Sequence, residues 1–136
     1  MRKREQRLWD RMRQALNGRV RLERIENVVS NGTADVFALA NGITTPMELK
    51  SVESFPVRAA TRVLGASGLS QDQKNWHHEW QRWGGRSLIV ISVGSRELFV
   101  ISGGVADKVN EMPAHELAAF ALARDWDELI VILERK

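Results

Sequence analysis

The chain has 136 residues, of which 43% are hydrophobic and 27% charged, with a net charge of +3 and no cysteine. This balance is typical of one folded domain rather than a disordered or membrane chain, and the lack of cysteine excludes disulfides, thiolate zinc sites and cysteine nucleophiles. The chain shows no apolar signal segment and no run of the roughly 18 apolar residues that a membrane span needs, so we expect a cytoplasmic protein with no membrane partner.

The first elements in chain order are a helix and a strand. In residues 3–16 the apolar positions recur every three or four residues, which predicts an amphipathic helix. Residues 19–28 alternate apolar and charged side chains, which predicts a strand with one face in water. Residues 30–32 read Ser-Asn-Gly and predict a turn.

A hairpin and a long loop follow. Asn41-Gly42 is a strong turn signal, and it predicts a hairpin between strands at 35–39 and 43–50. Residues 51–69 show little periodicity and predict a loop, of a length that usually belongs to a functional or disordered segment.

The second half alternates helices and strands. A capped helix is predicted over 70–83, strands over 87–93 and 97–101, and a last helix over 113–124. The Ile, Val and Leu residues of 128–134 fit a strand or a helical turn, and we favour the strand. Trp76, Trp80 and Trp83 lie at helical spacing on the 70–83 helix, and we expect them to belong to the core.

The charge is unevenly distributed along the chain. Residues 1–24 contain nine Lys and Arg against three Asp and Glu, a local charge of +6, and residues 50–86 contain six against three. Residues 87–136 contain five basic and eight acidic side chains. A basic N-terminal half indicates a polyanionic partner such as DNA, although the same residues also suit the solvated face of a surface helix.

Three polar residues in the hairpin point to metal chemistry. Glu48 and Lys50 are two apart on a strand and therefore share one face. Asp35 and Glu48 each lie six residues from the turn, so the hairpin brings the two carboxylates level. Hard oxygen ligands of this kind suit Mg²⁺ or Mn²⁺. The alternative is a surface Glu-Lys pair with a turn aspartate.

These residues also carry a resemblance to a known family. Gly32-Thr33-Ala34-Asp35 followed by Glu48-Leu49-Lys50 resembles the PD-(D/E)XK nuclease superfamily. Leu69-Ser70, Gln73 and Trp76, followed by Gly84-Gly85, resemble its VRR-NUC branch, which is phage-type and Holliday-junction-resolvase-like. The sequence departs from the family pattern at Ala34, where proline is usual, and in the long loop after Lys50.

The resemblance implies an α/β fold with an α-β-β-β-α-β core in residues 1–101, built on a mixed sheet flanked by helices. Residues 102–136 would form a helical extension packed on the same domain. The implied activity is that of a Mg²⁺- or Mn²⁺-dependent DNA endonuclease, structure-selective on branched DNA. The implied catalytic residues are Asp35, Glu48, Lys50, Gln73 and Glu5, and the implied metal-binding residues are Asp35, Glu48, Leu49 and Glu5.

Two of these residues also have structural explanations. Glu5 could be an ordinary first-turn acid interacting with the helix dipole. Gln73 lies three residues after Ser70, the spacing of a capping box. A histidine metal site is rejected, because His77 and His78 are adjacent on a helix and His115 is far away in sequence, although His77 could border the cleft.

We expect DNA to contact basic residues of the two basic segments, 1–24 and 50–86. These residues are Arg4, Arg7, Arg11, Arg58, Arg62 and Lys74. Cutting two strands of a branched DNA would require a symmetric homodimer. Two alternatives stay open, a non-catalytic DNA-binding module and a nuclease subunit of a larger DNA-processing complex.

Overall fold

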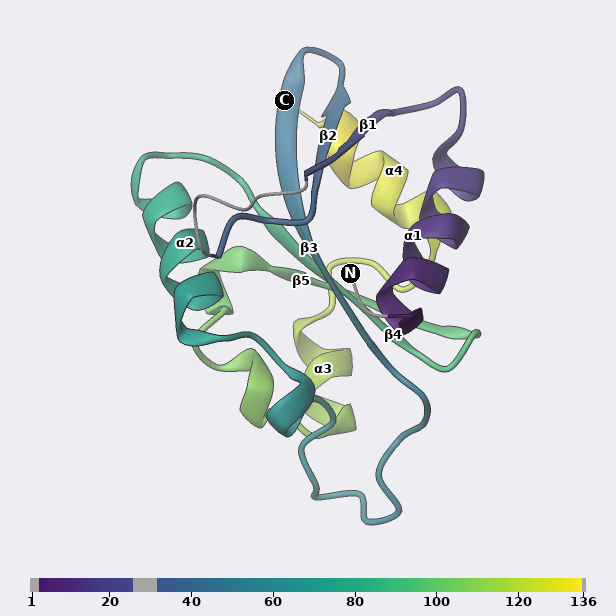
Figure 1. Cartoon of the computed structure of the whole chain (residues 1–136), viewed down its shortest axis with the longest axis vertical. Helices are drawn as coiled ribbons and strands as arrows, with labels where there is room; N and C mark the ends of the chain where they lie inside the picture. The colour runs from purple at the N-terminus through teal and green to yellow at the C-terminus, as the bar shows by residue number, and fades with distance from the viewer. Residues whose placement is uncertain (1–2, 26–31, 136) are drawn as a thin grey trace.

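The structure is a computed structural model and describes residues 3–25 and 32–135. Figure 1 shows a sheet flanked by helices. The helices are α1 (Lys3–Leu16), α2 (Gln71–Arg82), α3 (Ala114–Phe120) and α4 (Trp126–Glu134). The strands are β1 (Arg21–Arg24), β2 (Val36–Ala40), β3 (Ile43–Val52), β4 (Leu88–Val93) and β5 (Glu97–Ser102). Short 3-10 segments are η1 (Gly65–Ser67), η2 (Gly103–Val105) and η3 (Val109–Glu111).

The five strands form one mixed sheet in the order β1-β2-β3-β4-β5. All neighbours are antiparallel except β3 and β4, which are parallel and are connected through η1 and α2. The predicted α-β-β-β-α-β order and the mixed sheet flanked by helices are thereby confirmed. The end of the strand predicted over 19–28 and part of the 30–32 turn lie outside the described residues.

The β2-β3 hairpin has the predicted turn. Asn41 and Gly42 both have positive φ, 53° and 80°, as a two-residue turn with the right-handed strand twist requires. This turn sets a register in which Ala40 pairs with Ile43 and Val36 with Met47. The register carries the alternation of side chains along β2 onto β3 and determines which residues share a face.

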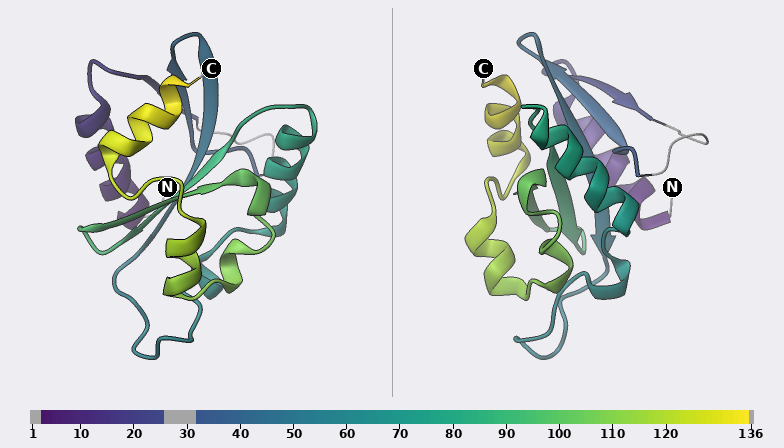
Figure 2. Two further views of the ribbon diagram at one scale, coloured as in Figure 1. Left: turned by 180° about the vertical axis from the view of Figure 1, so that it is seen from behind. Right: turned by 90° about the vertical axis from the view of Figure 1, so that its left-hand side faces the viewer.

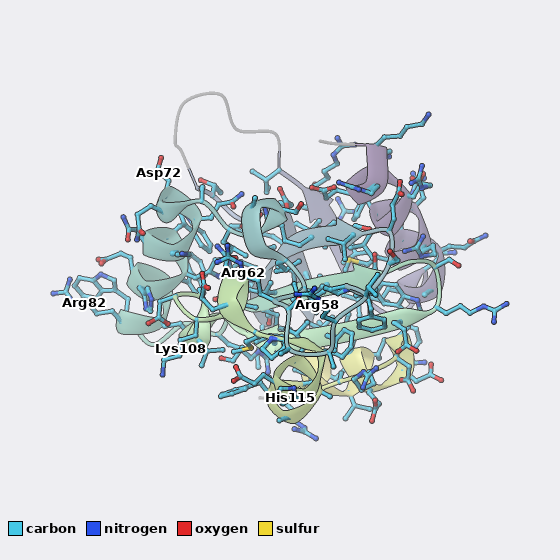
Figure 3. The ribbon with its side chains drawn as sticks, turned by 90° about the horizontal axis from the view of Figure 1, so that it is seen from below. Arg58, Arg62, Asp72, Arg82, Lys108 and His115 are labelled. Carbon is cyan, nitrogen blue, oxygen red and sulfur yellow. The ribbon has the colours of Figure 1, made fainter. Side chains whose placement is uncertain are left out.

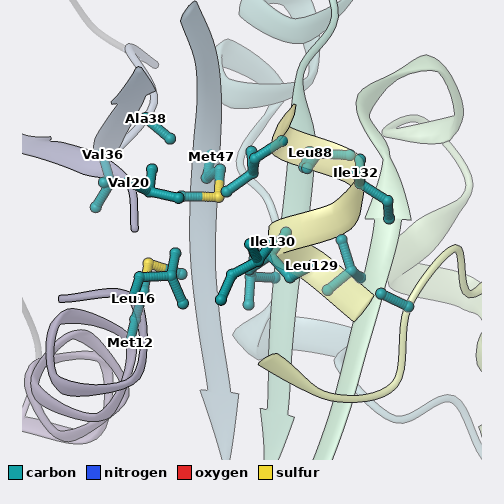
Figure 4. Close-up of a cluster of buried hydrophobic side chains, with 14 of the residues drawn as sticks. Met12, Leu16, Val20, Val36, Ala38, Met47, Leu88, Leu129, Ile130 and Ile132 are labelled. Atoms are coloured by element: carbon teal, nitrogen blue, oxygen red, sulfur yellow. The ribbon is translucent and has the colours of Figure 1, made fainter. Parts of the chain in front are cut away.

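One face of the sheet is covered by α1 and α4. The apolar stripe of α1 buries Leu8, Trp9, Met12 and Leu16, as its periodicity predicted. Figure 4 shows Met12 and Leu16 of this stripe and Leu129, Ile130 and Ile132 of α4 near Met47 and Leu88. This cluster anchors α1 against β3, the strand that carries the predicted site.

The opposite face holds a second cluster, made by Ile89 and Ile91 of β4, Phe99 and Ile101 of β5 and the 3-10 segments and α3. Helix α2 lies beside this cluster, over the β2-β3 side of the sheet (Figures 1 and 2). The two further views in Figure 2 show the sheet between its helical layers. None of the helices in the described ranges is both long and apolar enough to cross a membrane.

The C-terminal region corrects two predictions. Residues 128–134, favoured as a strand, belong to α4 instead. Asp125 caps this helix by accepting a hydrogen bond from the Glu128 N–H, and the apolar residues bury a helical face while Val131 is 51% exposed. The helix predicted over 113–124 ends at Phe120, because the following residues turn to pair with β5 through a Val100–Ala123 bridge.

The tryptophans of α2 correct a third prediction. Trp76 and Trp80 are half-buried and stack on one another, with ring centroids 5.1 Å apart, against Phe37 of β2. Trp83, expected in the core, is 79% exposed because α2 ends one residue before it. The division into a core at 1–101 and an extension at 102–136 stays a prediction. The two helices of that extension, α3 and α4, pack on opposite faces of the sheet.

Candidate active site

A cleft of about 600 Å³ opens where β3 passes beneath the N-terminal ends of α1 and α2. All five residues predicted as catalytic line it, and they come from four separate elements or their edges. The lining residues are Glu5, Asp35, Glu48, Leu49, Lys50, Ala66, Gly68, Leu69, Ser70 and Gln73.

Asp35 occupies the point at which β2 and β3 separate. The ladder between these strands extends only to Val36↔Met47, and β3 continues beyond it to Val52. The Asp35 carboxylate accepts a hydrogen bond of 2.8 Å from the Leu49 N–H. Since the N–H and C=O of a strand residue point to the same side, the Leu49 carbonyl also faces this open edge, and Leu49 could contact a cation only through that oxygen.

Glu48 and Lys50 lie on one face of β3, with Leu49 buried in the α1 cluster between them. The Glu48 side chain is fully buried, whereas Lys50 is partly exposed in the cleft. The predicted arrangement of a carboxylate and an amine on the same face is therefore present. A buried carboxylate needs compensation by hydrogen bonds or by positive charge.

Gln73 is both a capping residue and a cleft residue. Its main-chain N–H donates to Ser70 Oγ and its Oε1 accepts from the Ser70 N–H, which is the capping box. Its Nε2 donates to Glu48 Oε2 at 3.2 Å. The two explanations of Gln73 are thus compatible, because the capping bonds fix the amide and aim its free N–H group at Glu48.

Glu48 is held in an unfavourable environment for a negative charge. Burial raises the pKa of its carboxyl group far above its ordinary value of 4.5, and the nearby Asp35 raises it further. Lys50 acts in the opposite direction, and Glu5 adds to the increase. Carboxylates gathered in this way favour the binding of a cation, which replaces the proton and relieves their repulsion.

This environment leads to a stability prediction for Glu48→Gln. A folded-state pKa above the unfolded value means that the folded protein binds more protons, so metal-free stability falls as pH rises from 4.5 through neutrality. The glutamine removes that loss and keeps an acceptor for Gln73 Nε2–H, while its amide NH₂ requires the neutral His77 ring to accept at Nε2 by taking its other tautomer. In EDTA we expect the variant to have a higher Tm at pH 8, by roughly 5 °C, since about 1 kcal/mol moves Tm by ~4 °C.

The same comparison at pH 5 provides the control, because fewer unfolded carboxyls are ionised there and the difference in Tm should shrink. A Glu48→Gln protein that is no more stable than wild type at pH 8 would contradict the conclusion that the charge of Glu48 destabilises the folded protein.

Glu5 reaches the cleft from the first turn of α1. Its side chain is 9% exposed, and within the described residues its Oε2 atom is buried without a hydrogen-bond partner. An orphaned carboxylate oxygen beside two further carboxylates fits a hard cation or an ordered water. Residues 3–25 and 32–135 contain no ready-made cage of three His, Cys, Asp or Glu side chains. Mg²⁺ does not require one, because it binds through one or two carboxylates and retains water.

His77 contacts the back of the site. It is fully buried one helical turn after Gln73, with Nε2 3.4 Å from Glu48 Oε1 and Nδ1 2.8 Å from Ser87 Oγ. Burial lowers the pKa of His77 to about 4, and the neighbouring His78 adds to the decrease, so the ring is neutral. The spacing of four from Gln73 suggested that His77 borders the cleft, but no sequence signal pointed to Ser87.

The predicted DNA-binding residues fall into separate groups. Arg4, Arg7 and Arg11 line a second hollow of about 280 Å³, together with the end of β3 and Gly94-Ser95. The hollow and the cleft have no lining residue in common, although Arg4 and Ser51 of the hollow are the chain neighbours of Glu5 and Lys50 of the cleft.

None of the six predicted basic residues lines the cleft, and the other three do not line the hollow either. Arg58 and Arg62 lie on the underside of the molecule (Figure 3), where Arg62 forms an ion pair of 2.8 Å with Glu111. Lys74 is half-buried in the first turn of α2. Of these six residues, the three arginines of α1 are the ones gathered around one hollow.

Comparison with known proteins rests on the fold. No protein-family model matches the sequence, and no curated protein sequence matches it. Among solved structures the chain is similar to Hjc, a Holliday junction resolvase from the archaeal hyperthermophile Archaeoglobus fulgidus. The TM-score is 0.50 at 14% identity, and the alignment covers 74% of this chain and 75% of the resolvase.

The chain has a restriction-endonuclease-like fold. In this fold the cleft described above lies where β2 and β3 diverge, and the carboxylates, the lysine and the glutamine converge there from strands and helices far apart in sequence. At 14% identity the likeness concerns the fold alone.

Proposed function

We propose that the protein is a Mg²⁺- or Mn²⁺-dependent DNA endonuclease. The observation that carries the proposal is the convergence of Glu5, Asp35, Glu48, Lys50 and Gln73 in one cleft of a restriction-endonuclease-like fold. The unpartnered Glu5 oxygen and the buried Glu48 carboxyl support a cation in this cleft. The sequence resemblance to the VRR-NUC branch and the resolvase fold agree with this proposal.

Each residue has a role in the proposed reaction. Asp35 and Glu48, with the Leu49 carbonyl and Glu5, would hold the ion, which when bound lowers the pKa of a water and stabilises phosphoryl charge. Lys50 would orient the attacking water through its ammonium group and stabilise the negative charge that develops on the phosphate. Gln73 would keep Glu48 in place through its Nε2–H group. The water oxygen would bond to phosphorus as one P–O ester bond breaks, which leaves a phosphate on one DNA end and, after protonation, a hydroxyl on the other.

The proposed substrate is branched DNA, by analogy with the Holliday junction that the similar resolvase acts on. A four-way junction has two strands to cut, so the proposal includes a symmetric homodimer that presents two clefts. Sedimentation analysis with and without a junction tests this part independently of cleavage.

The function is tested by incubating the protein with linear, nicked and four-way DNA in Mg²⁺, Mn²⁺ or EDTA. We expect cleavage of the four-way DNA in Mg²⁺ or Mn²⁺ and none in EDTA. Cleavage that persists in EDTA would overturn the proposed metal site. Binding without cutting in every condition would favour a non-catalytic DNA-binding module or a subunit that needs a partner.

The arginines of α1 lead to a prediction about DNA affinity. Because each contact with a phosphate releases counterions, Arg7→Ala should reduce the slope of log K against log salt by about 1 and weaken binding by roughly 3- to 10-fold. Binding is measured in EDTA at several salt concentrations to prevent cleavage. Arg82→Ala is the matched control, because Arg82 lies at the far end of α2 (Figure 3) and pairs with Glu79. Equal salt slopes for both variants would show that α1 does not contact the DNA.

A further inference from the structure

A chain of polar side chains, buried from Ser87 to Glu48, runs behind the cleft and ends on Glu48. Gln81 Nε2 donates to Ser87 Oγ at 3.4 Å, Ser87 Oγ lies 2.8 Å from His77 Nδ1, and His77 Nε2 lies 3.4 Å from Glu48 Oε1. The side chains of Ser87, His77 and Glu48 are all fully buried. Glu48 lines the cleft, whereas His77 and Ser87 are not among its lining residues.

The tautomer of the imidazole is coupled to the direction of its hydrogen bond with Ser87. A serine hydroxyl has one proton to donate, and Ser87 Oγ already accepts from Gln81. When the Ser87 proton is donated to Nδ1 of His77, the ring carries its own proton on Nε2. That Nε2–H then donates to Glu48 Oε1, so the chain delivers a hydrogen-bond donor to the carboxylate.

The fold leaves space for this chain at one position. Gly103, at the start of η2, packs directly against Ser87 and His77, and a Cβ atom there would collide with Ser87 Oγ and lie 2.9 Å from His77 Nδ1. Gly103 has an ordinary negative φ, so the backbone conformation does not call for glycine. The requirement at this position is space for the Ser87–His77 pair.

Gln73 and His77 hold different oxygens of the same carboxylate. Gln73 Nε2 donates to Oε2 and His77 Nε2 faces Oε1, and both side chains come from one face of α2, four residues apart. Two donors on two oxygens fix the plane of the carboxylate and leave its remaining lone pairs for the cleft. Hydrogen-bond partners of a metal-binding side chain commonly fix its orientation and tune its affinity for the metal.

We propose that His77, oriented by Ser87, is a positioning residue that fixes the Glu48 carboxylate for cation binding. This inference rests on the proposed function, because it assigns Glu48 to the cation. His77 itself contacts neither cation nor DNA, so its effect should appear first in cation affinity. A histidine that served only to fill the core would have no such effect.

The test uses two variants that differ in one hydrogen-bond donor. Glutamine can place an amide N–H near the position of His77 Nε2, whereas leucine fills similar space without a donor. We expect His77→Leu to weaken Mn²⁺ binding by about 10- to 100-fold and His77→Gln to stay within about 3-fold of wild type, as measured by calorimetry on the full chain. Thermal unfolding in EDTA shows whether both variants fold.

A second measurement observes the tautomer directly in wild-type protein. Long-range ¹H–¹⁵N NMR spectra of the imidazole should show His77 protonated on Nε2 and unprotonated on Nδ1, and Ser87→Ala should shift or broaden this pattern. This readout needs neither metal nor DNA. It also stays informative if the leucine variant fails to fold.

Several outcomes would overturn the proposal. They are equal Mn²⁺ affinities of folded His77→Leu and His77→Gln, a wild-type His77 protonated on Nδ1, and a wild-type protein that binds no Mn²⁺. The last would overturn the proposed function as well. A protein that binds Mn²⁺ with the expected difference between variants but cuts no DNA would contradict the proposed function and leave the role of His77 supported.

Discussion

Asp35→Asn is expected to reduce Mg²⁺-dependent DNA cleavage by at least about 10³-fold. Asparagine keeps an oxygen that can accept the Leu49 N–H bond, so the junction of β2 and β3 should persist. What is lost is the negative charge next to Glu48, and the ion supplies several kcal/mol of transition-state stabilisation, with about 1.4 kcal/mol for each factor of ten. Single-turnover cleavage of a four-way junction measures the effect.

Asp10→Asn is the matched control, because it removes an exposed carboxylate on α1, 48% exposed in its side chain, without touching the cleft. Calorimetry should show weaker Mn²⁺ binding than wild type for Asp35→Asn and unchanged binding for Asp10→Asn. If Asp35→Asn cuts at the wild-type rate, Asp35 does not bind the catalytic ion and the proposed site is wrong.

Lys50→Met is expected to lower the rate of the chemical step by about 10²- to 10⁴-fold, the range typical of a group that moves a proton or stabilises developing charge. Methionine keeps most of the length and the apolar stem of lysine and removes only the charged group. Because Lys50 contributes positive charge next to Glu48, its loss should leave Mn²⁺ affinity unchanged or increase it. Loss of rate with retained metal binding would therefore separate Lys50 from the carboxylates.

Lys108→Met serves as the comparison, because Lys108 is an exposed lysine that does not line the cleft. Lys50→Met should bind DNA in EDTA nearly as well as wild type, since the proposed DNA contacts lie mainly on α1. A parallel loss of DNA affinity and rate would instead assign Lys50 to substrate binding.

The sequence was most informative where local rules act directly. The Asn41-Gly42 turn sets the hairpin register through backbone geometry, and equal spacing from the turn then brings Asp35 and Glu48 together. Side chains two apart on a strand share a face, which unites Glu48 with Lys50. The capping signal of Ser70 and Gln73 marked the start of α2 correctly.

Sequence patterns failed where packing decided the outcome. Residues 128–134 have the composition of a strand, but they form α4 because Asp125 caps them and the free sheet face beside α1 accepts a helix. Trp83 has the helical spacing of a core residue, yet α2 ends before it can reach the sheet. Neither the helical state of residues 128–134 nor the exposure of Trp83 can be predicted from local propensity.

The sequence by itself therefore determined the order of elements as far as β5, the register of the hairpin and the residue types that suit metal chemistry, because turns, caps and periodicity act over a few residues. Only the tertiary structure decided that α1 delivers Glu5 to the cleft and that α2 and the start of β4 enclose Glu48 through Gln73, His77 and Ser87. The contacts among Glu48, Gln73, His77 and Ser87 join residues 10 to 29 positions apart, and the packing of helices on the sheet brings them together.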